Sequence, residues 1–171
     1  SKNNSELIYL LLSNKDVDLS IRGKDNKSIL HYACEIGDLE LVKLFISKDK
    51  NAIEIKDDNN KTVLHYACES GNKDLVEYLI SLDQIDINCK DEKNKSILNF
   101  ACESENYELL KYLISLKKID VNSIDENGKT LLHYLCESEN LEIIKYINSL
   151  EAIKFDCKDN EGKTLLHYAC Q

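Results

Sequence analysis

The 171-residue chain contains no proline, no tryptophan and no methionine, and it has only five glycines. The lack of proline excludes collagen-like and proline-rich linker proteins, and it means that the turns are built from Asn, Asp and the few Gly. Apolar residues never run continuously over the roughly 20 positions that a membrane-spanning helix needs. We therefore expect a chain that does not insert into membranes.

Positive charge is the minority charge. The chain has 22 Lys and Arg against 31 Asp and Glu, which gives a formal net charge of −9. A nucleic-acid binder needs a clustered basic surface, so this class is excluded as well. The cysteine count of seven is odd, and no charged-apolar-small leader opens the sequence. We expect reduced thiols and an intracellular, cytoplasmic location, with a nuclear location left open.

One octet recurs with a period of 34 residues. It reads SILHYACE from Ser28, TVLHYACE from Thr62, SILNFACE from Ser96, TLLHYLCE from Thr130 and TLLHYACQ from Thr164. A period of roughly 20 to 50 residues is typical of a stacked array rather than of one globular unit. We predict a single array over residues 1–171, made of a half unit, four whole units and a half unit. Because the last half unit carries no polar capping substitutions, we expect a piece of a longer array.

Each unit contains two helical patterns. In residues 91–124, Ser96 is the predicted N-cap of a short first helix, and Asn106 is the predicted N-cap of a second, with Leu109, Leu110 and Leu113 on its apolar face. Before each first helix, one column holds only Asn or Gly: Asn26, Asn60, Asn94, Gly128 and Gly162. These residues tolerate a positive φ, which predicts the tip of a tight hairpin-like turn. The fold class is therefore an all-α repeat solenoid.

The period alone would also suit a tetratricopeptide repeat, but that repeat carries a Trp/Gly/Tyr pattern that this chain lacks. The Ser/Thr-x-Leu-His-x-Ala-Cys octet instead resembles the ankyrin repeat, whose signature is T-P-L-H-x-A. Two departures are visible. The period is one residue longer than the usual 33, and the proline is replaced by Ile29, Val63, Ile97, Leu131 and Leu165. The resemblance implies helix–turn–helix units joined by hairpin-like loops.

The resemblance also implies a binding surface, because hairpins and first helices line the concave side of ankyrin arrays. The variable exposed positions there are the candidate partner-binding residues. They are Lys24, Asp25, Glu35, Ile36, Asp58, Asn59, Glu69, Ser70, Glu92, Lys93, Glu103, Ser104, Glu126, Asn127, Glu137, Ser138, Asn160 and Glu161. Ile36 is an apolar residue in a polar column and hence a candidate anchor. Two charge ladders, with one Lys and one Glu per unit, are expected to be solvated and to pair across repeats. A second interpretation, compatible with the first, is that they form a striped and mainly acidic recognition groove.

Histidine and cysteine recur together as His-x-x-Cys, a spacing that shares one helix face, at His31/Cys34, His65/Cys68, His133/Cys136 and His167/Cys170. Zinc needs ligands converging at about 2.0–2.3 Å, whereas each unit offers one pair and neighbouring helices pack roughly 8–10 Å apart. We predict that all five cysteines of this column, with Cys102, are buried thiols that bind no metal. Cys89 and Cys157 belong to another column and are expected to be partly exposed.

No nucleophile–base–acid set and no glycine-rich phosphate loop occurs in the sequence, so we predict no catalysis and no cofactor. The leading interpretation is a non-catalytic protein–protein interaction module. Its partner would be another protein and not a nucleic acid, and the chain itself would be a monomer open to end-to-end contacts through uncapped termini. Two alternatives remain: a regulatory or targeting ankyrin region of a larger multidomain enzyme or channel, and a purely structural spacer.

Overall fold

The structure is a computed structural model that describes residues 8, 10, 18–137, 141–150 and 153–170. The described part contains nine α-helices and two short 3₁₀ helices and no strand longer than an isolated bridge. The α-helices are α2 (Ile29–Ile36), α3 (Leu39–Lys48), α4 (Val63–Glu69), α5 (Lys73–Ile80), α6 (Ile97–Glu103), α7 (Tyr107–Ser115), α8 (Leu131–Glu137), α9 (Leu141–Asn148) and α10 (Leu165–Ala169). The 3₁₀ helices are η1 (Lys24–Asn26) and η2 (Lys50–Glu54).

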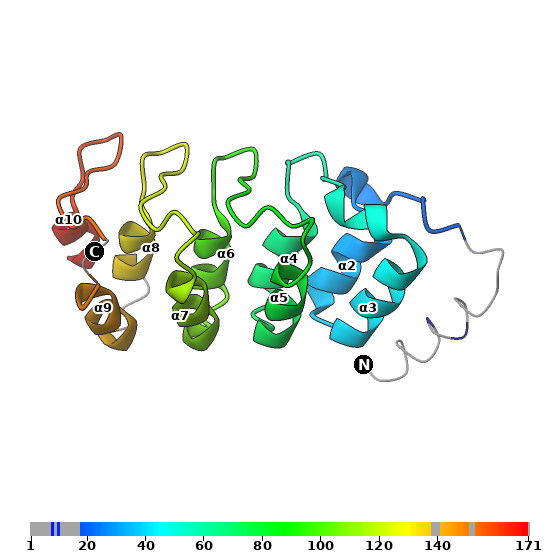
Figure 1. Cartoon of the computed structure of the whole chain (residues 1–171). Helices are drawn as coiled ribbons and strands as arrows, with labels where there is room; N and C mark the ends of the chain where they lie inside the picture. Colours follow the sequence, from blue (N-terminus) through cyan, green and yellow to red (C-terminus); the bar gives the residue numbers. More distant parts are fainter. Residues whose placement is uncertain (1–7, 9, 11–17, 138–140, 151–152, 171) are drawn as a thin grey trace.

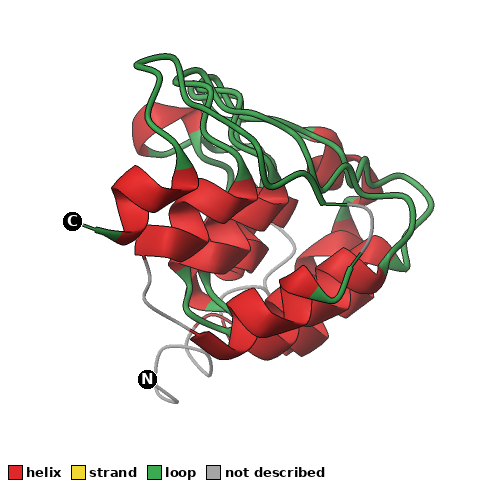
Figure 2. Ribbon diagram, turned by 90° about the vertical axis from the view of Figure 1, so that its left-hand side faces the viewer, coloured by secondary structure: helices red, strands yellow, loops and turns green. Residues whose placement is uncertain are grey.

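The helices form a regular stack, which confirms the predicted all-α solenoid. Figure 1 shows the first helices of the units in one row, the second helices in a row beneath them, and the hairpins above. We number the repeats by their first helices, so that repeats 1 to 5 contain α2, α4, α6, α8 and α10. Figure 2 views the stack from its end and shows the two helical layers with the loops gathered along one side. The half unit predicted at the start of the chain lies mostly outside the described residues.

Side-chain caps set the start of the second helices. Asp38, Asn72 and Asn106 accept hydrogen bonds from the backbone amides three residues later, at 3.0, 3.1 and 3.1 Å. The amide groups of Asn72 and Asn106 also donate to a backbone carbonyl of the preceding repeat, at 2.7 Å in both cases. An asparagine at this position therefore caps the second helix and also links it to the preceding repeat. The equivalent residue of repeat 4, Asn140, lies outside the described residues.

The hairpin tips adopt the predicted left-handed backbone. The φ angles are 59° at Asn26, 58° at Asn60 and Asn94, 76° at Gly128 and 80° at Gly162. A second left-handed column, which the sequence analysis missed, joins the first helix of a unit to its second. Gly37 and Gly71 have φ of 76° and 71° there, and Glu105 takes the same position in repeat 3 with φ of 58°.

The core lies between neighbouring helices of the stack. The leucines at the second position of the first helices, Leu30, Leu64, Leu98 and Leu132, are all buried, whereas their equivalent in repeat 5, Leu166, is 76% exposed. Each first helix is thus covered by the helix of the next repeat, and no described helix follows α10. No helix in the described part of the chain is long and apolar enough to cross a membrane.

The cysteines that recur every 34 residues are likewise buried inside the stack and exposed at its open end. Cys34, Cys68 and Cys102 are buried as predicted, and burial raises the pKa of each thiol, to about 12 for Cys102. The prediction is wrong for the last two members, because Cys136 is half-buried and Cys170 is exposed at the open end of the stack.

The second cysteine column is also corrected in part. Cys89 is only 7% exposed, because its sulfur packs within 3.5 Å of the Thr62 hydroxyl and 3.8 Å of the His65 ring. Cys157, the other member of this column, is half-buried, which fits the prediction.

We predict that Glu105→Gly stabilises the protein. Glycine adopts the left-handed conformation without the steric cost that a β-carbon adds, so the free energy of unfolding should rise by about 1 kcal/mol. Urea unfolding of the two proteins measures the difference. The matched control is Gly71→Ala, which should lower the stability by a similar amount. A lower stability for Glu105→Gly would contradict the backbone assigned to this turn.

We also predict a graded reactivity of the thiols. In the native protein at mildly alkaline pH, Cys170 should react rapidly with a chromogenic disulfide reagent, because it is exposed. Cys34, Cys68 and Cys102 should react only on the timescale of unfolding. Mass spectrometry of partly labelled protein identifies the modified residues. Fast labelling of Cys68 without denaturant would contradict the stacking of α4 between its neighbours.

Candidate functional site

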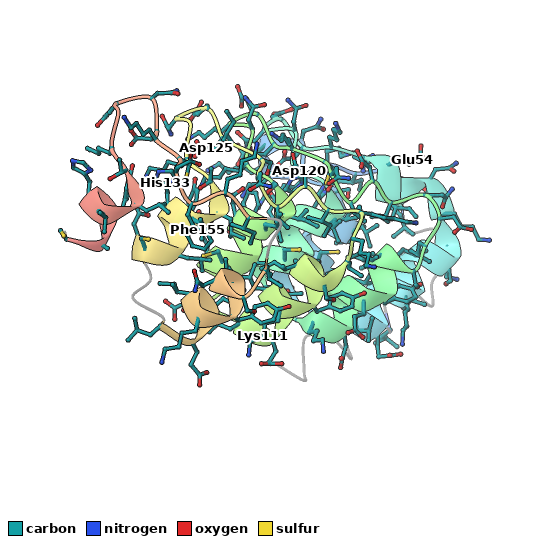
Figure 3. The ribbon with its side chains drawn as sticks, turned by 60° about the vertical axis from the view of Figure 1, so that its left-hand side comes forward. Glu54, Lys111, Asp120, Asp125, His133 and Phe155 are labelled. Atoms are coloured by element: carbon teal, nitrogen blue, oxygen red, sulfur yellow. The ribbon has the colours of Figure 1, made fainter. Side chains whose placement is uncertain are left out.

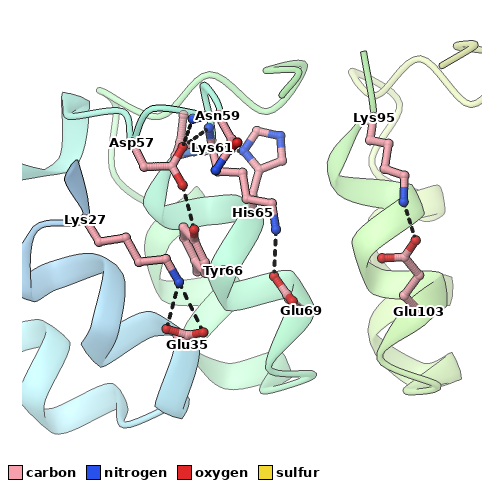
Figure 4. A network of polar contacts seen from close by, with 11 residues as sticks. Lys27, Glu35, Asp57, Asn59, Lys61, His65, Tyr66, Glu69, Lys95 and Glu103 are labelled. Atoms are coloured by element: carbon pink, nitrogen blue, oxygen red, sulfur yellow. Dashed lines mark hydrogen bonds and ion pairs between the residues drawn. The ribbon is translucent and has the colours of Figure 1, made fainter. Parts of the chain in front are cut away.

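One aspartate in each of repeats 2 to 5 organises the hairpin. In repeat 2, Asp57 Oδ1 accepts hydrogen bonds from the backbone amides of Asn59 and Lys61, at 2.9 and 2.8 Å. Its second oxygen, Oδ2, accepts a hydrogen bond from the Tyr66 hydroxyl at 2.6 Å (Figure 4). A single buried carboxylate therefore closes the turn and ties it to the first helix. We call this arrangement the hairpin clamp.

The hairpin clamp recurs along the array with informative exceptions. Repeats 4 and 5 repeat it in full, with tyrosine–aspartate distances of 2.7 and 2.6 Å for Tyr134–Asp125 and Tyr168–Asp159. In repeat 3, Asp91 keeps both amide contacts, at 2.9 and 2.8 Å, but Phe100 stands in place of the tyrosine. Repeat 1 has Gly23 in place of the aspartate, and its turn differs, with two consecutive left-handed residues. The sequence analysis missed the clamp, although the recurring Asp nine residues before Tyr is a visible signal.

The hairpin tips are joined to one another by backbone hydrogen bonds. The amides of Asp58, Glu92, Glu126 and Asn160 each donate to a carbonyl at the tip of the preceding hairpin, at 3.0, 2.8, 2.9 and 2.8 Å. This ladder places the side chains of successive tips in a row. Figure 3 shows Asp125, from the fourth hairpin, on this side of the array, and Lys111, from a second helix, on the opposite edge.

The recurring histidines have a structural role. The Nδ1 atom of His65 accepts a hydrogen bond from the Thr62 backbone amide at 3.0 Å, and its ring meets the Phe100 ring of the next repeat edge-on, with the centroids 5.2 Å apart. Burial lowers the pKa of His65 to about 4. In repeat 3, Asn99 Oδ1 accepts the same hydrogen bond from Ser96 at 2.8 Å. The described residues contain no group of three His, Cys, Asp or Glu side chains placed to hold a metal ion.

The two charge ladders pair within repeats, and the prediction that they pair across repeats is wrong. The four ion pairs measure 3.2, 3.2, 2.6 and 2.9 Å for Lys27–Glu35, Lys61–Glu69, Lys95–Glu103 and Lys129–Glu137. Three of these pairs are drawn in Figure 4.

The lysines still connect neighbouring repeats, through aromatic rings rather than through carboxylates. The ammonium of each lysine lies over the aromatic ring of the next repeat, at 4.4, 4.5, 5.3 and 4.8 Å from the ring centroid for Lys27–Tyr66, Lys61–Phe100, Lys95–Tyr134 and Lys129–Tyr168. Such contacts contribute about 0.5–1 kcal/mol each when exposed, and more when desolvated. The glutamates of the ladder therefore position cations that stabilise the stack.

The described residues of the predicted binding set belong to the hairpin tips and to the first helices and their C-terminal ends, which together form one side of the array (Figure 1). We call it the concave surface. Five of the predicted residues, Asn59, Glu69, Glu92, Lys93 and Glu103, line a groove of about 290 Å³ between the second and third hairpins. Four further residues of this groove were not predicted as binding residues: Lys61, Asp91, Lys95 and Phe100.

The remaining predicted residues divide into three groups. Ile36 is 70% exposed, and exposed side chains are also found at Lys24, Asp25, Glu35, Asp58, Glu126, Asn127, Glu137, Asn160 and Glu161. Ser70 and Ser104 are half-buried, because their hydroxyls donate to the carbonyls of Ala67 and Ala101 at 2.8 and 2.9 Å. They therefore cap the ends of the first helices rather than face a partner. Ser138 lies outside the described residues.

We predict that His65→Asn reduces the pH dependence of stability. The pKa of His65 is about 4 when folded against a usual 6.5, so the unfolded chain binds more protons as the pH falls through this window. The contribution of neutral His65 to the free energy of unfolding is fully present above about pH 6.5. It is lost as the pH falls towards 4, by up to about 3 kcal/mol. Urea unfolding across this range should show a smaller loss of stability for the variant. Its asparagine can accept the hydrogen bond from the Thr62 amide, as Asn99 accepts one from Ser96. An unchanged slope would contradict a buried, neutral His65.

The comparison with known protein families agrees with these observations. A family model for ankyrin repeats matches three times, at residues 1–91, 83–154 and 98–171. A search of the curated proteins finds no match to the chain. The stacked helix pairs, the hairpins between them and the matched residues all follow one pattern, and the chain belongs to the ankyrin-repeat family.

Proposed function

We propose that this chain is a non-catalytic protein-interaction module that binds a partner protein on its concave surface. Ankyrin repeats in general are protein-interaction modules, which supports the class of function. The observation that carries the choice of surface is the backbone ladder between the hairpin tips, with distances of 2.8–3.0 Å. It holds exposed, variable side chains in a fixed row, and a preformed surface binds with a smaller loss of conformational entropy.

The charges of this surface favour a basic or mixed-charge partner segment. The lysines of the ladder are neutralised by the adjacent glutamates. The acids of the central hairpin tips, Asp58, Glu92 and Glu126, are exposed and form no side-chain ion pair with any described residue. A row of such acids on a chain of net charge −9 speeds the encounter with a positively charged protein.

The test is a charge reversal at the hairpin tips. The triple variant Asp58→Lys, Glu92→Lys, Glu126→Lys is compared with the wild-type chain by affinity capture followed by measurement of association rates. The variant should lose the partner that the wild type retains, and association should slow by about tenfold or more at low salt. Because the three side chains are exposed, the variant should unfold at nearly the same urea concentration.

A matched control carries three reversals on the second helices: Glu40→Lys, Glu77→Lys and Glu108→Lys. Each of these acids forms a surface ion pair, with Lys43, Lys73 or Lys111, that contributes about 0–1 kcal/mol. The control changes the net charge by the same amount, so it should retain the partner if the concave surface is the site. Equal loss of binding in both variants would remove the case for that surface.

A further inference from the structure

Repeat 3 differs from its neighbours at the hairpin clamp. In repeats 2, 4 and 5 a tyrosine hydroxyl donates to the Oδ2 atom of the clamp aspartate. Phe100 has no hydroxyl, so Asp91 Oδ2 has no hydrogen-bond partner among the described residues. Asp91 is nevertheless only 8% exposed. Oδ2 still meets solvent at the wall of the groove, so an ionised donor that replaced this solvent would form a charge-assisted hydrogen bond with it.

This unpaired oxygen belongs to the groove of the concave surface. Asp91 and Phe100 both line the groove between the second and third hairpins, together with Glu69, Glu92 and Glu103. The volume of about 290 Å³ is large enough for the end of a long side chain, but not for a separate folded element. The open donor position and the cavity therefore coincide at one place in the array.

The charges around the groove select the kind of donor. Lys61 and Lys95 are each paired with a glutamate of their own repeat, at 3.2 and 2.6 Å. The charges left over are Asp91 and Glu92, both acidic, against the single Lys93. The groove thus has an excess of negative charge next to an unpaired carboxylate oxygen, which favours a cationic donor over a neutral one.

We propose that this groove is a subsite that receives an arginine side chain of the partner protein. The guanidinium donates one N–H to Asp91 Oδ2 from the groove, beside the edge of the Phe100 ring, and directs others towards Glu92. Arginine suits this geometry because its planar group offers five donors in a fixed fork, whereas lysine is a compact point charge. The inference rests on the proposed function and specifies the partner chemistry at one point of the concave surface.

The decisive variant is Phe100→Tyr, which restores the clamp hydroxyl. It should raise the midpoint of urea unfolding, because the Tyr hydroxyl satisfies Asp91 Oδ2. It should at the same time weaken binding of N-acetyl-arginine amide, the probe, because the donor position is then filled. NMR titration, followed at the backbone amides of Lys93 and Lys95, should show saturable shifts for the wild type and at least about fivefold weaker binding for the variant. A structural defect would lower stability and binding together.

The controls are two matched amide substitutions. Asp91→Asn keeps an oxygen for the amides of Lys93 and Lys95 but removes the anionic Oδ2, so it should abolish the response to the arginine probe. Asp159→Asn makes the same change in repeat 5, where Tyr168 already donates to the carboxylate and no hairpin residue lines the groove, so it should leave the response intact. The neutral analogue N-acetyl-citrulline amide should not bind in the groove of the wild type or of either control variant.

Two results would overturn the inference: no saturable shift at Lys93 and Lys95 with the arginine probe, or equal binding by wild type and Phe100→Tyr. Either result would leave the proposed function standing if the hairpin-tip variant still loses the captured partner. Conversely, arginine binding at the groove together with an unchanged capture by the hairpin-tip variant would refute the concave surface as the partner site and retain the groove as a local ligand site.

Discussion

A single carboxylate holds each hairpin of repeats 2, 4 and 5 in place. Asp57 illustrates the arrangement, because one oxygen closes the turn through two backbone amides and the other accepts the hydroxyl of Tyr66 in the first helix. Without this tie, a loop that contains no proline to fix its φ angles would have more conformations available. The tie joins the hairpin to the first helix of its own repeat, and the backbone ladder joins the tips of successive hairpins, including those of repeats 1 and 3, which lack the tyrosine contact. The two sets of hydrogen bonds together hold the row of tips on the concave surface.

The lysine ladder shows how stability and surface chemistry are linked in this array. Lys61 is paired with Glu69 of its own repeat, while its ammonium lies over Phe100 of the next. The same cations that would otherwise dominate the concave surface are therefore used to join repeats. As a result, the electrostatic character of the surface is left to the exposed hairpin acids. The histidines act in the same interfaces as neutral groups, because burial lowers their pKa.

Much of the fold could be predicted from the sequence, because the motifs that specify the helices and turns are local and recur in every repeat. The period of 34 residues and the Asn/Gly column at Asn60 were sufficient for the helix pairs and the left-handed tips. The burial of Cys170 was predicted wrongly, because it depends on whether another helix covers it and not on its own motif. The partner of Lys61 was also predicted wrongly, because it depends on three-dimensional placement. The left-handed backbone at Glu105 was missed, although Gly37 and Gly71 mark the same column in the sequence. At the candidate site, the exposure of most predicted side chains could be inferred from the sequence. The groove and the unpaired oxygen of Asp91 could be found only in the structure.

The central claim is that the partner is bound by the concave surface. Hydrogen–deuterium exchange of the chain, free and saturated with its captured partner, tests it most directly because it reports every repeat at once. The account predicts slower exchange in peptides that cover the hairpins around residues 57–61, 91–95 and 125–129. Peptides from the second helices α5 and α7 should exchange at an unchanged rate. Protection confined to α5 and α7, with the hairpins unaffected, would contradict the account.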